Sequence, residues 1–393
     1  MPWKESCAMD ERIRFIAAHG SHSHSMVELC ELFGISRKTG YKWLARYAAE
    51  GAAGLAERSH APHRPANVTP EAIVEQIVGQ REARPSWGPR KIIGRLSLLH
   101  PDVAWPSPST AGEILKRAGL VGPRRLHRRA PARMEALRRA LEPNHVWAVD
   151  HKGWIRLRDG ARCEPLTITD AFSRYLIGLQ ATASTRDQDA RPVFERAFRE
   201  HGLPDTIRSD NGPPFASTGV TGLTALSAWW AKLGIAHERI DPGKPQQNGR
   251  HERFHRTLLE AMRPACANRA EQELRFAAFR RDYNEERPHE ALGQKPPASF
   301  YRPSPRQMPD RPPEPDYPPE AAVRRVRSNG EIKWRGGMVH VSSALIGELI
   351  CVEETELGEW RVRFYATPLG LIDAATNRIR PQKPTLNPTP KTE

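Results

Sequence analysis

The stretch Val146-Trp147-Ala148-Val149-Asp150 is an apolar run that ends in a carboxylate, and it decides the fold of this chain. Such a run predicts a buried β-strand that delivers Asp150 at its far end. Two more acids stand in equally distinct settings: Asp210 follows Ile207-Arg208-Ser209, and Glu252 follows Asn248-Gly249-Arg250-His251. Carboxylate oxygens are the ligands that Mg²⁺ prefers. The three acids therefore predict metal-dependent chemistry on phosphodiesters, in which two ions roughly 3.5 to 4 Å apart stabilise the attacking and leaving oxygens.

The residues after Asp150 predict the rest of an α/β core. We expect strands at 165–169, 175–179, 206–209 and 235–240, helices at 188–199 and 223–233, and a helix from Gln247 toward Ala265 that carries Glu252. Three adjacent strands followed by alternating helix and strand fit a ribonuclease-H-like arrangement. In that arrangement neighbouring strands bring Asp150 and Asp210 together across 59 intervening residues.

The charge of the chain indicates the kind of partner it meets. Lys and Arg total 60 against 46 Asp and Glu, which gives a formal net charge of +14 over 393 residues. The length favours about two to four domains. The basic excess predicts an anionic polymer, nucleic acid first, and the alternative is a charge that only keeps the protein soluble.

The cysteines and the apolar segments indicate a reducing compartment. Cys7, Cys30, Cys163, Cys266 and Cys351 are far apart and form no Cys-x-x-Cys pair, so neither a disulfide framework nor a cysteine zinc site is expected. No segment approaches the roughly 18 uninterrupted apolar residues that a membrane span needs. We expect a cytoplasmic protein with no membrane partner.

The amino-terminal residues predict a helix-turn-helix. Residues 11–18 and 26–33 have helical apolar spacing, and Gly34-Ile35 forms a short turn into a third helix at 36–47 that Ser36 can cap. The early polar residues of that helix would face the DNA major groove, and the alternative is a small helical bundle with a charged surface. These candidate DNA contacts are Arg37, Lys38, Thr39, Tyr41 and Lys42.

A second helical module follows a proline-rich break at 61–70. Its apolar positions predict three helices, one opening at Trp87-Gly88-Pro89 and one capped near Ser107, and its plan resembles a second helix-turn-helix. A basic stretch then tracks phosphates or serves as a solvated linker. Its arginines are Arg124, Arg125, Arg128, Arg129, Arg133, Arg138 and Arg139.

The carboxyl-terminal part predicts a small β-barrel. A proline-dense linker is expected up to residue 320, and alternating apolar residues then suggest a five-stranded, SH3-like domain. Ser328-Asn329-Gly330 predicts a hairpin between strands at 323–326 and 332–334. Beyond Arg378, repeated Pro and Lys with few apolar side chains predict a disordered tail.

Three core motifs carry a resemblance to a known family. They are Ser209 to Phe215, Pro242 to Gly249 leading to Glu252, and Tyr283 to Leu292 with Pro296-Pro297 after it. In this order they resemble bacterial insertion-sequence transposases with a retroviral-integrase-type catalytic core, called DDE after its three acids. The resemblance covers roughly the whole chain. One departure is that 41 residues separate Asp210 from Glu252, more than in the compact form of the family, and the surplus is expected within 217–226.

The resemblance implies Asp150, Asp210 and Glu252 as catalytic residues and metal ligands. It implies Mg²⁺ or Mn²⁺ as cofactor, two ions per active site with DNA bound. Asp170 is the main rival acid, but its context suits a turn between strands. Glu285 and Glu286 are expected to be surface or structural residues.

Residues around Glu252 are further candidates for DNA contact. Lys244, Asn248, Arg250 and Arg256 are plausible phosphate contacts, and His255 shares a helical face with Glu252 at a spacing of three. For His255 the alternative is an ordinary polar residue on a half-exposed helix.

The sequence therefore predicts a multidomain DNA transposase. It would bind the terminal repeats of an element and target DNA, cleave 3′ ends, join strands, and form a homo-oligomer on DNA. The alternatives are a catalytically silent, domesticated DNA-binding regulator and a nuclease of the same fold. The expected domains are 1–60 and 61–122 (helix-turn-helix), 123–143 (basic linker), 144–300 (catalytic core), 301–320 (Pro-rich linker), 321–375 (β domain) and 376–393 (tail).

Overall fold

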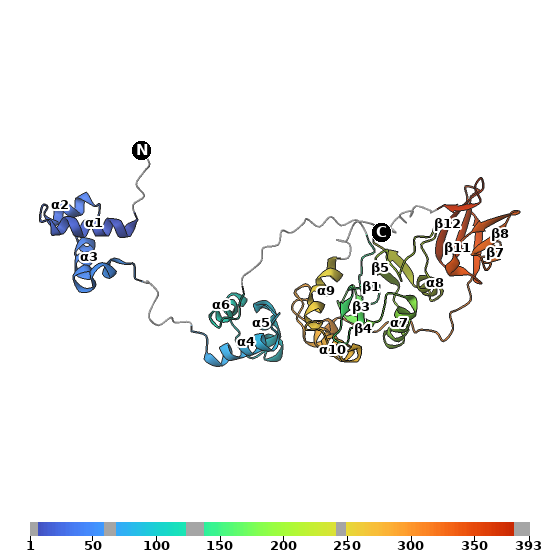
Figure 1. Cartoon of the computed structure of the whole chain (residues 1–393), viewed down its shortest axis with the longest axis horizontal. Coiled ribbons are helices and arrows are strands. Elements are labelled where there is room, and N and C mark those ends of the chain that lie inside the picture. The colour runs from blue at the N-terminus through green and yellow to red at the C-terminus, as the bar shows by residue number, and fades with distance from the viewer. Residues whose placement is uncertain (1–6, 59–67, 123–136, 241–248, 381–393) are drawn as a thin grey trace, which may run out of the picture. The chain divides into compact units, whose positions relative to one another are not determined.

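The computed structural model describes residues 7–58, 68–122, 137–240 and 249–380, without the side chains of Arg250 and Glu252. The chain divides into two compact units, 1–70 and 71–393, which are described separately (Figure 1). Several predicted features lie outside the described residues: Lys244, Asn248, most of the basic linker and the tail beyond 380. Among the described helices none is both long and apolar enough to cross a membrane.

The first unit is a helix-turn-helix, as the sequence predicts. It consists of α1 (Ala8–Gly20), α2 (Met26–Leu32) and α3 (Arg37–Glu50), with a short 3₁₀ turn at Gly51–Leu55. The Ser36 hydroxyl caps α3 by accepting a hydrogen bond of 3.2 Å from the Thr39 backbone N–H. At Gly40 a Cβ atom would lie 2.9 Å from the Cys30 Sγ, so only glycine lets α3 pack this closely against α2.

A second module of three helices belongs to the second unit. It contains α4 (Glu71–Ala83), α5 (Pro89–Leu99) and α6 (Pro108–Arg117). The predicted cap is present, because the Ser107 hydroxyl accepts from the Thr110 N–H at 3.2 Å. Apolar side chains from all three helices form one small core around the buried Trp87, with Ile77, Ile92, Leu96 and Leu115.

This module contacts the segment Asp282–Glu286, which follows α10 (Arg269–Arg281). Arg84 donates to Asp282 at 3.1 Å and forms an ion pair with Glu286, which also lies 3.5 Å from Arg95. Close packing accompanies these charges, since a Cβ atom at Gly94 would lie 2.9 Å from the Gln294 side chain. Glu286 is thus a structural residue of a charged interface, as its sequence context suggested.

We expect Arg84→Glu to loosen the α4–α6 module from the core. The change replaces an attraction with a repulsion toward Glu286, and partly exposed ion pairs contribute on the order of 1 kcal/mol. Hydrogen exchange of α5 amides should therefore become about fivefold faster. The double variant Arg84→Glu/Glu286→Arg should restore protection, and unchanged exchange in the single variant would contradict the interface.

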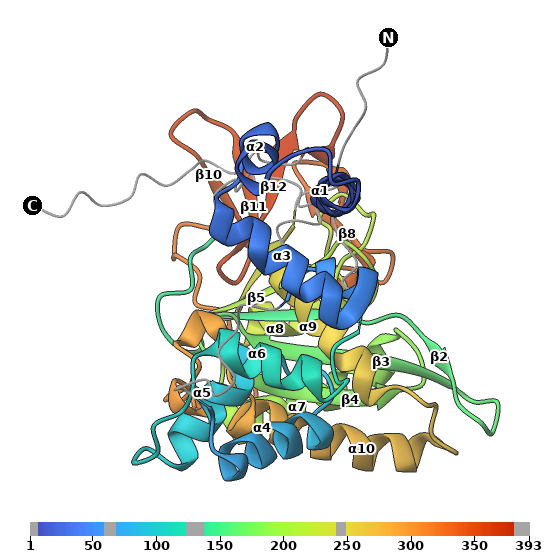
Figure 2. The same ribbon diagram turned by 90° about the vertical axis from the view of Figure 1, so that its left-hand side faces the viewer.

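The core sheet contains every strand that the sequence predicts and one more, β2. Strands β1 (Val146–His151), β2 (Ile155–Arg156), β3 (Arg162–Asp170) and β4 (Leu176–Thr182) pair antiparallel, with β3 between β1 and β4. Strands β5 (Thr206–Ser209) and β6 (Ala236–Arg239) then continue the sheet parallel to β1. The β2–β3 hairpin extends at the edge of the sheet (Figure 2). This is the ribonuclease-H-like arrangement.

Two helical layers cover the sheet. Helices α7 (Asp187–His201) and α8 (Ala225–Lys232) pack on one face, where Phe194, Phe198 and Trp230 are buried against Trp147 and Val149. Helices α9 (Gly249–Ala261) and α10 (Arg269–Arg281) pack on the other face, around Leu258 and Phe276. Because side chains alternate along β1, Ala148 and Asp150 belong to the α9 face.

The carboxyl-terminal β domain has seven strands, not the expected five. They are β7 (Ala322–Arg325), β8 (Glu331–Trp334), β9 (Gly337–His340), β10 (Leu349–Glu354), β11 (Trp360–Phe364), β12 (Thr367–Asp373) and β13 (Arg378–Arg380). Their order is β7-β10-β11-β12-β13-β9-β8, a nearly closed barrel. The predicted turn at 328–330 forms, with the Gly330 N–H donating to the Arg327 carbonyl at 2.9 Å. The predicted pairing of the strands on either side of it is wrong, because β7 pairs with β10 and β8 pairs with β9. The tight hairpin turn is Arg335-Gly336, where both residues have positive φ.

The β domain also extends further than expected. Strand β13 pairs with β12 and buries Ile379, so residues 378–380 belong to the barrel and not to a tail. A single buried isoleucine between two arginines gives too weak an alternation to read as a strand from sequence. The domain packs on the core through α8, where Ala228 and Ala231 join its apolar cluster and Lys232 pairs with Glu348 at 2.6 Å.

Candidate active site

Two of the three predicted acids lie at the ends of neighbouring strands. In the parallel pair β1–β5, Trp147 is the partner of Ile207 and Ala148 that of Arg208. Continued by two residues, this register sets Asp150 beside Asp210. Both residues are half-buried. The expectation that the fold brings these two acids together is therefore met by the strand pairing.

The loop after β5 fixes the position of Asp210. The Gly212 N–H donates to the Asp210 Oδ1 at 3.2 Å, and the Asn211 side chain donates to the Ile240 carbonyl at 2.6 Å. Phe215 is buried and stacks on His151, the residue after Asp150, with ring centroids 5.7 Å apart. The predicted motif at 209–215 thus ties the Asp210 loop to the end of β1.

The third acid lies on α9, on the same face of the sheet as Asp150. Glu252 falls in the first turns of this helix, as expected, and its side chain is outside the described residues. The helix ends at Ala261, earlier than the predicted Ala265. Pro264 explains the difference, because its ring disfavours a helical conformation for the residue before it.

A buried polar cluster fixes α9 against the sheet. We call His251, His255, Thr167 and Thr169 the His–Thr cluster. Thr167 Oγ1 lies 2.6 Å from the His251 Nε2 and 3.1 Å from the His255 Nε2, and Thr169 Oγ1 lies 3.2 Å from the His251 Nδ1. Burial lowers the pKa of His251 to about 3 and that of His255 to about 2, so both rings are neutral at pH 7.

The sequence reasoning missed this cluster. Its signal was present: histidines four residues apart on a helix and threonines two residues apart on a strand lie on single faces of their elements. His255 is 7% exposed, so it is neither half-exposed nor placed to contact DNA as considered from the sequence. Arg256 next to it is exposed, so the two residues do not share an accessible face.

The predicted motif at 283–292 supports α9 from its far side. Tyr283 packs edge-on against Phe254, with ring centroids 5.3 Å apart, and the Arg287 guanidinium donates to the Thr257 hydroxyl at 3.4 Å. Asn284 bonds to both backbone groups of Leu176 at the start of β4, at 2.8 and 3.0 Å. This motif therefore links the helix that carries Glu252 to the sheet.

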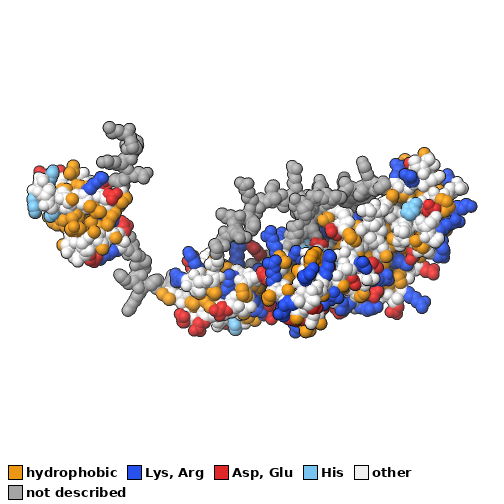
Figure 3. Space-filling model, in the orientation of Figure 1, with side chains coloured by type: hydrophobic (Ala, Val, Ile, Leu, Met, Phe, Trp, Pro, Cys, Tyr) orange, Lys and Arg blue, Asp and Glu red, His pale blue; other side chains and the backbone are white. Residues whose placement is uncertain are grey.

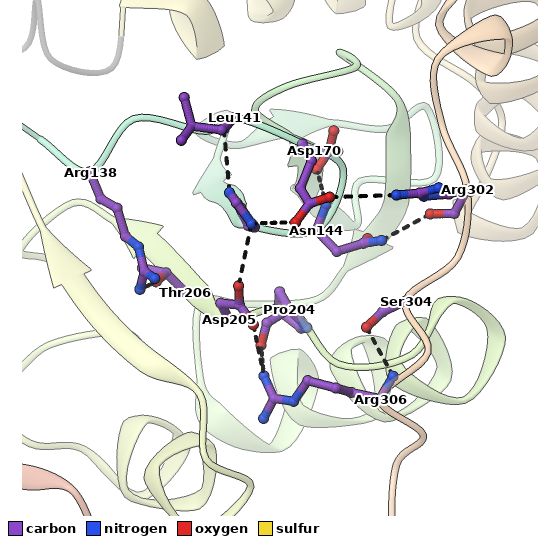
Figure 4. Close-up of polar contacts among 12 residues, drawn as sticks. Arg138, Leu141, Asn144, Asp170, Pro204, Asp205, Thr206, Arg302, Ser304 and Arg306 are labelled. Atoms are coloured by element: carbon purple, nitrogen blue, oxygen red, sulfur yellow. Dashed lines mark hydrogen bonds and ion pairs between the residues drawn. The ribbon is translucent and has the colours of Figure 1, made fainter. Parts of the chain in front are cut away.

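Asp170, the rival acid, pairs with Trp147 near the start of β1, three residues before Asp150. Figure 4 shows its side chain beside Asn144. It is 1% exposed and accepts hydrogen bonds from the Asn144 N–H at 2.8 Å, the Ser173 N–H at 2.7 Å and the Ser173 hydroxyl at 2.6 Å. Asn144 in turn accepts from the Trp147 indole N–H and the Tyr301 hydroxyl. Asp170 holds a turn, as its sequence context predicted.

A half-buried histidine near the Asp210 loop sets a pH-dependent contribution to stability. The His237 Nε2 lies 2.8 Å from the Ser209 hydroxyl, and its ring packs edge-on against Trp230. Burial, helped by the positive charge of Arg239, lowers the pKa of His237 to about 4 from an ordinary 6.5. A lowered folded-state pKa means stability that is present above pH 6.5 and lost as the pH falls toward 4.

We expect His237→Gln to flatten this pH dependence. The free energy of unfolding of the wild type should fall between pH 6.5 and about 4, by on the order of 2 kcal/mol more than that of the variant. Urea unfolding of both proteins at several pH values measures the difference. If the free energies of unfolding of the two proteins changed in parallel with pH, the His237 ring would be charged in the folded protein over this pH range, contrary to the prediction.

The candidate DNA contacts of α3 lie at its surface. Arg37, Lys38, Tyr41 and Lys42 are exposed, and Thr39 is half-buried by its contact with Ser36. Arg250 lies in α9 without a described side chain. Over the face drawn in Figure 3, Lys and Arg side chains occur on each part of the chain with Asp and Glu between them.

The donor groups around Asp150 fit a divalent cation. Asp150, His251 and His255 each offer a ligand atom, and these atoms lie within 4.8 Å of one another. In the described part of the chain this is the one such group of three. Asp210 adds a second carboxylate on the neighbouring strand. The two carboxylates suit Mg²⁺ and Mn²⁺, and the imidazole nitrogens are donors that transition-metal ions accept more readily than Mg²⁺ does.

Family models match the chain from its first helices to its last strand. An integrase core domain matches residues 140–245 and 233–297, and the C-terminal domain of IS481 family transposases matches 321–380. A helix-turn-helix domain matches residues 11–64, and a homeodomain-like domain matches 39–115.

Two curated relatives come from bacterial insertion elements. The 31.7 kDa protein of insertion element IS407 from Burkholderia multivorans is 32% identical over 48% of this chain and 66% of its own length. The 39.2 kDa protein of insertion element IS476 from Xanthomonas euvesicatoria is 29% identical over 58% of this chain and 64% of its own. The chain thus spans just under two thirds of both. Among solved structures, the catalytic core domain of HTLV-2 integrase is 18% identical, with a TM-score of 0.31, over 42% of this chain and 100% of that chain.

Proposed function

We propose that this chain, which carries an integrase core domain and the C-terminal domain of IS481 family transposases, is a DNA transposase that performs 3′-end cleavage and strand transfer. The observation that carries the proposal is the parallel pairing of β1 with β5. It sets Asp150 and Asp210 side by side, on the sheet that α9 covers with Glu252 in its first turns.

Asp150, Asp210 and Glu252 would hold Mg²⁺ or Mn²⁺, two ions per site with DNA bound. When bound, the ions would neutralise the charge that develops on the reacting phosphodiester and activate the water or hydroxyl oxygen that attacks it. The protein's own contribution is to fix the acids: strand pairing holds Asp150, the Gly212 N–H orients Asp210, and the His–Thr cluster seats α9. Water would attack the phosphodiester at the element end, leaving a 3′-hydroxyl on the element and a 5′-phosphate on the flanking DNA. That 3′-hydroxyl would then attack a target phosphodiester, joining the element to a target 5′-phosphate and releasing a target 3′-hydroxyl, without a covalent protein intermediate.

The remaining domains would supply DNA recognition. The exposed polar face of α3, with Arg37, Lys38 and Lys42, suits a major groove, and Lys244, Asn248, Arg250 and Arg256 are proposed phosphate contacts. A multimer would process two element ends together at the bacterial nucleoid. Phosphate contacts imply that end binding weakens steeply with salt.

A strand-transfer assay with a labelled duplex of the native element end tests the proposal. We expect wild-type protein with Mg²⁺ or Mn²⁺ to join the labelled 3′ end to a target plasmid. Cleavage without joining would favour a nuclease of this fold. Specific end binding without any chemistry would favour a regulator that has kept the fold.

A further inference from the structure

We propose that His255 is a metal ligand in this site, so that the ion at Asp150 is bound through a carboxylate oxygen and an imidazole nitrogen together. The inference rests on the proposed function, because it concerns the same cation. His255 reaches the site from α9, three residues after Glu252. Its Nδ1 lies 3.8 Å from the Asp150 Oδ2, a separation that two ligands of one ion can span.

The Nδ1 of His255 faces Asp150, and the hydrogen bonds of Thr167 determine whether this nitrogen carries a proton. The Thr167 hydroxyl has a single proton, and it donates this proton to the Asp150 backbone carbonyl at 2.8 Å. The hydroxyl can then only accept from the two rings, so the Nε2 atoms of His251 and His255 both carry a proton. The neutral His255 ring consequently presents an unprotonated Nδ1 toward the Asp150 carboxylate.

A carboxylate oxygen and an unprotonated imidazole nitrogen at this separation can bind one cation together. The His255 side chain is 9% exposed and that of Asp150 is 22% exposed, so the carboxylate remains accessible to an ion from solvent. The buried Thr167 hydroxyl acts as the outer partner that fixes the tautomer of a ligating histidine.

His251 is the weaker candidate, although one of its ring nitrogens also lies near this group. Both of its nitrogens are occupied, the Nε2 by Thr167 at 2.6 Å and the Nδ1 by Thr169 at 3.2 Å. The Nδ1 of His251 keeps its lone pair, but that lone pair points at the Thr169 hydroxyl, whereas the Nδ1 of His255 points at the Asp150 carboxylate. We therefore assign His251 to positioning α9 and His255 to the metal.

The consequence is a preference for metals that accept nitrogen. Mg²⁺ binds oxygen donors almost exclusively, whereas Mn²⁺ accepts imidazole as well. Loss of the imidazole should therefore weaken Mn²⁺ binding about tenfold or more while changing Mg²⁺ binding much less.

Pulsed electron paramagnetic resonance of Mn²⁺ bound to the full chain tests this assignment without relying on activity. Wild-type protein should show coupling of the ion to a ¹⁴N nucleus, which becomes ¹⁵N coupling in protein grown with ¹⁵N-histidine. The coupling should vanish in His255→Gln and persist in His237→Gln, a variant of a histidine that bonds to Ser209 instead. The isotope experiment stands even where a variant folds poorly.

The outcomes separate the two claims. Mn²⁺ binding that is lost in Asp150→Asn but shows no nitrogen coupling in wild type would overturn the role of His255 and leave the acidic site intact. Mn²⁺ binding that is unaffected by Asp150→Asn would overturn the metal site of the proposed function itself.

Discussion

Asp210→Asn should abolish DNA joining while leaving the protein folded and able to bind element ends. The amide keeps the shape of the side chain and can still accept from the Gly212 N–H, but it lacks the charge that holds a divalent cation. Removal of a group that acts only on the reacting phosphate lowers the rate by about a thousandfold or more. Strand transfer with a labelled native end, run beside an end-binding assay, measures both properties.

A matched control lies on the same segment of chain. Asp205 pairs with Arg306 at 3.3 Å (Figure 4). It immediately precedes β5, whereas Asp210 immediately follows this strand. Asp205→Asn should therefore join DNA at nearly the wild-type rate. Equal loss in both variants would mean that the defect comes from folding, and retained joining by Asp210→Asn would remove this acid from the catalytic set.

Asp170→Ala should differ from Asp210→Asn, because we expect it to lower the stability of the fold strongly through contacts that lie outside the candidate active site. The change leaves the N–H groups of Asn144 and Ser173 without their buried acceptor. Each buried donor left unpaired costs about 1–3 kcal/mol, so we expect the free energy of unfolding to fall by about 3 kcal/mol. Equilibrium unfolding in urea, followed by tryptophan fluorescence, measures the loss.

Asp159→Ala is the control for this prediction. Asp159 is an exposed acid in the β2–β3 turn that accepts one hydrogen bond, from the Ala161 N–H at 2.9 Å. Its removal should cost less than about 1 kcal/mol. A similar loss in the two variants, or a small loss in Asp170→Ala, would contradict the structural role assigned to Asp170.

The core of this protein was predictable because local and long-range signals agree. The apolar run before Asp150 has only one plausible state, a buried strand, and the short strand at 206–209 was placed correctly because charged and apolar residues bound it clearly. The family motifs then identified which three acids to compare with the catalytic residues of the family. The caps at Ser36 and Ser107 followed from the chemistry of helix ends alone.

Features that depend on distant partners were not predictable. The role of Thr167 exists only because β3 passes beside α9, and nothing near Thr167 in the sequence announces His251 or His255. The β domain shows the same limit: Asn329-Gly330 does form a turn, yet β7 leaves it to pair with β10. Pairing across a barrel is decided by which edges meet, and local turn signals do not record that choice.

The most direct test of the account is whether joining requires a free 3′-hydroxyl on the element end. Wild-type protein with Mn²⁺ would be given a pre-cleaved, labelled native end carrying either a 3′-hydroxyl or a 3′-deoxy terminus. The account predicts joined product from the hydroxyl end only, with the labelled 3′ end linked to target DNA. Joining from both ends, or a labelled protein–DNA covalent species, would contradict it.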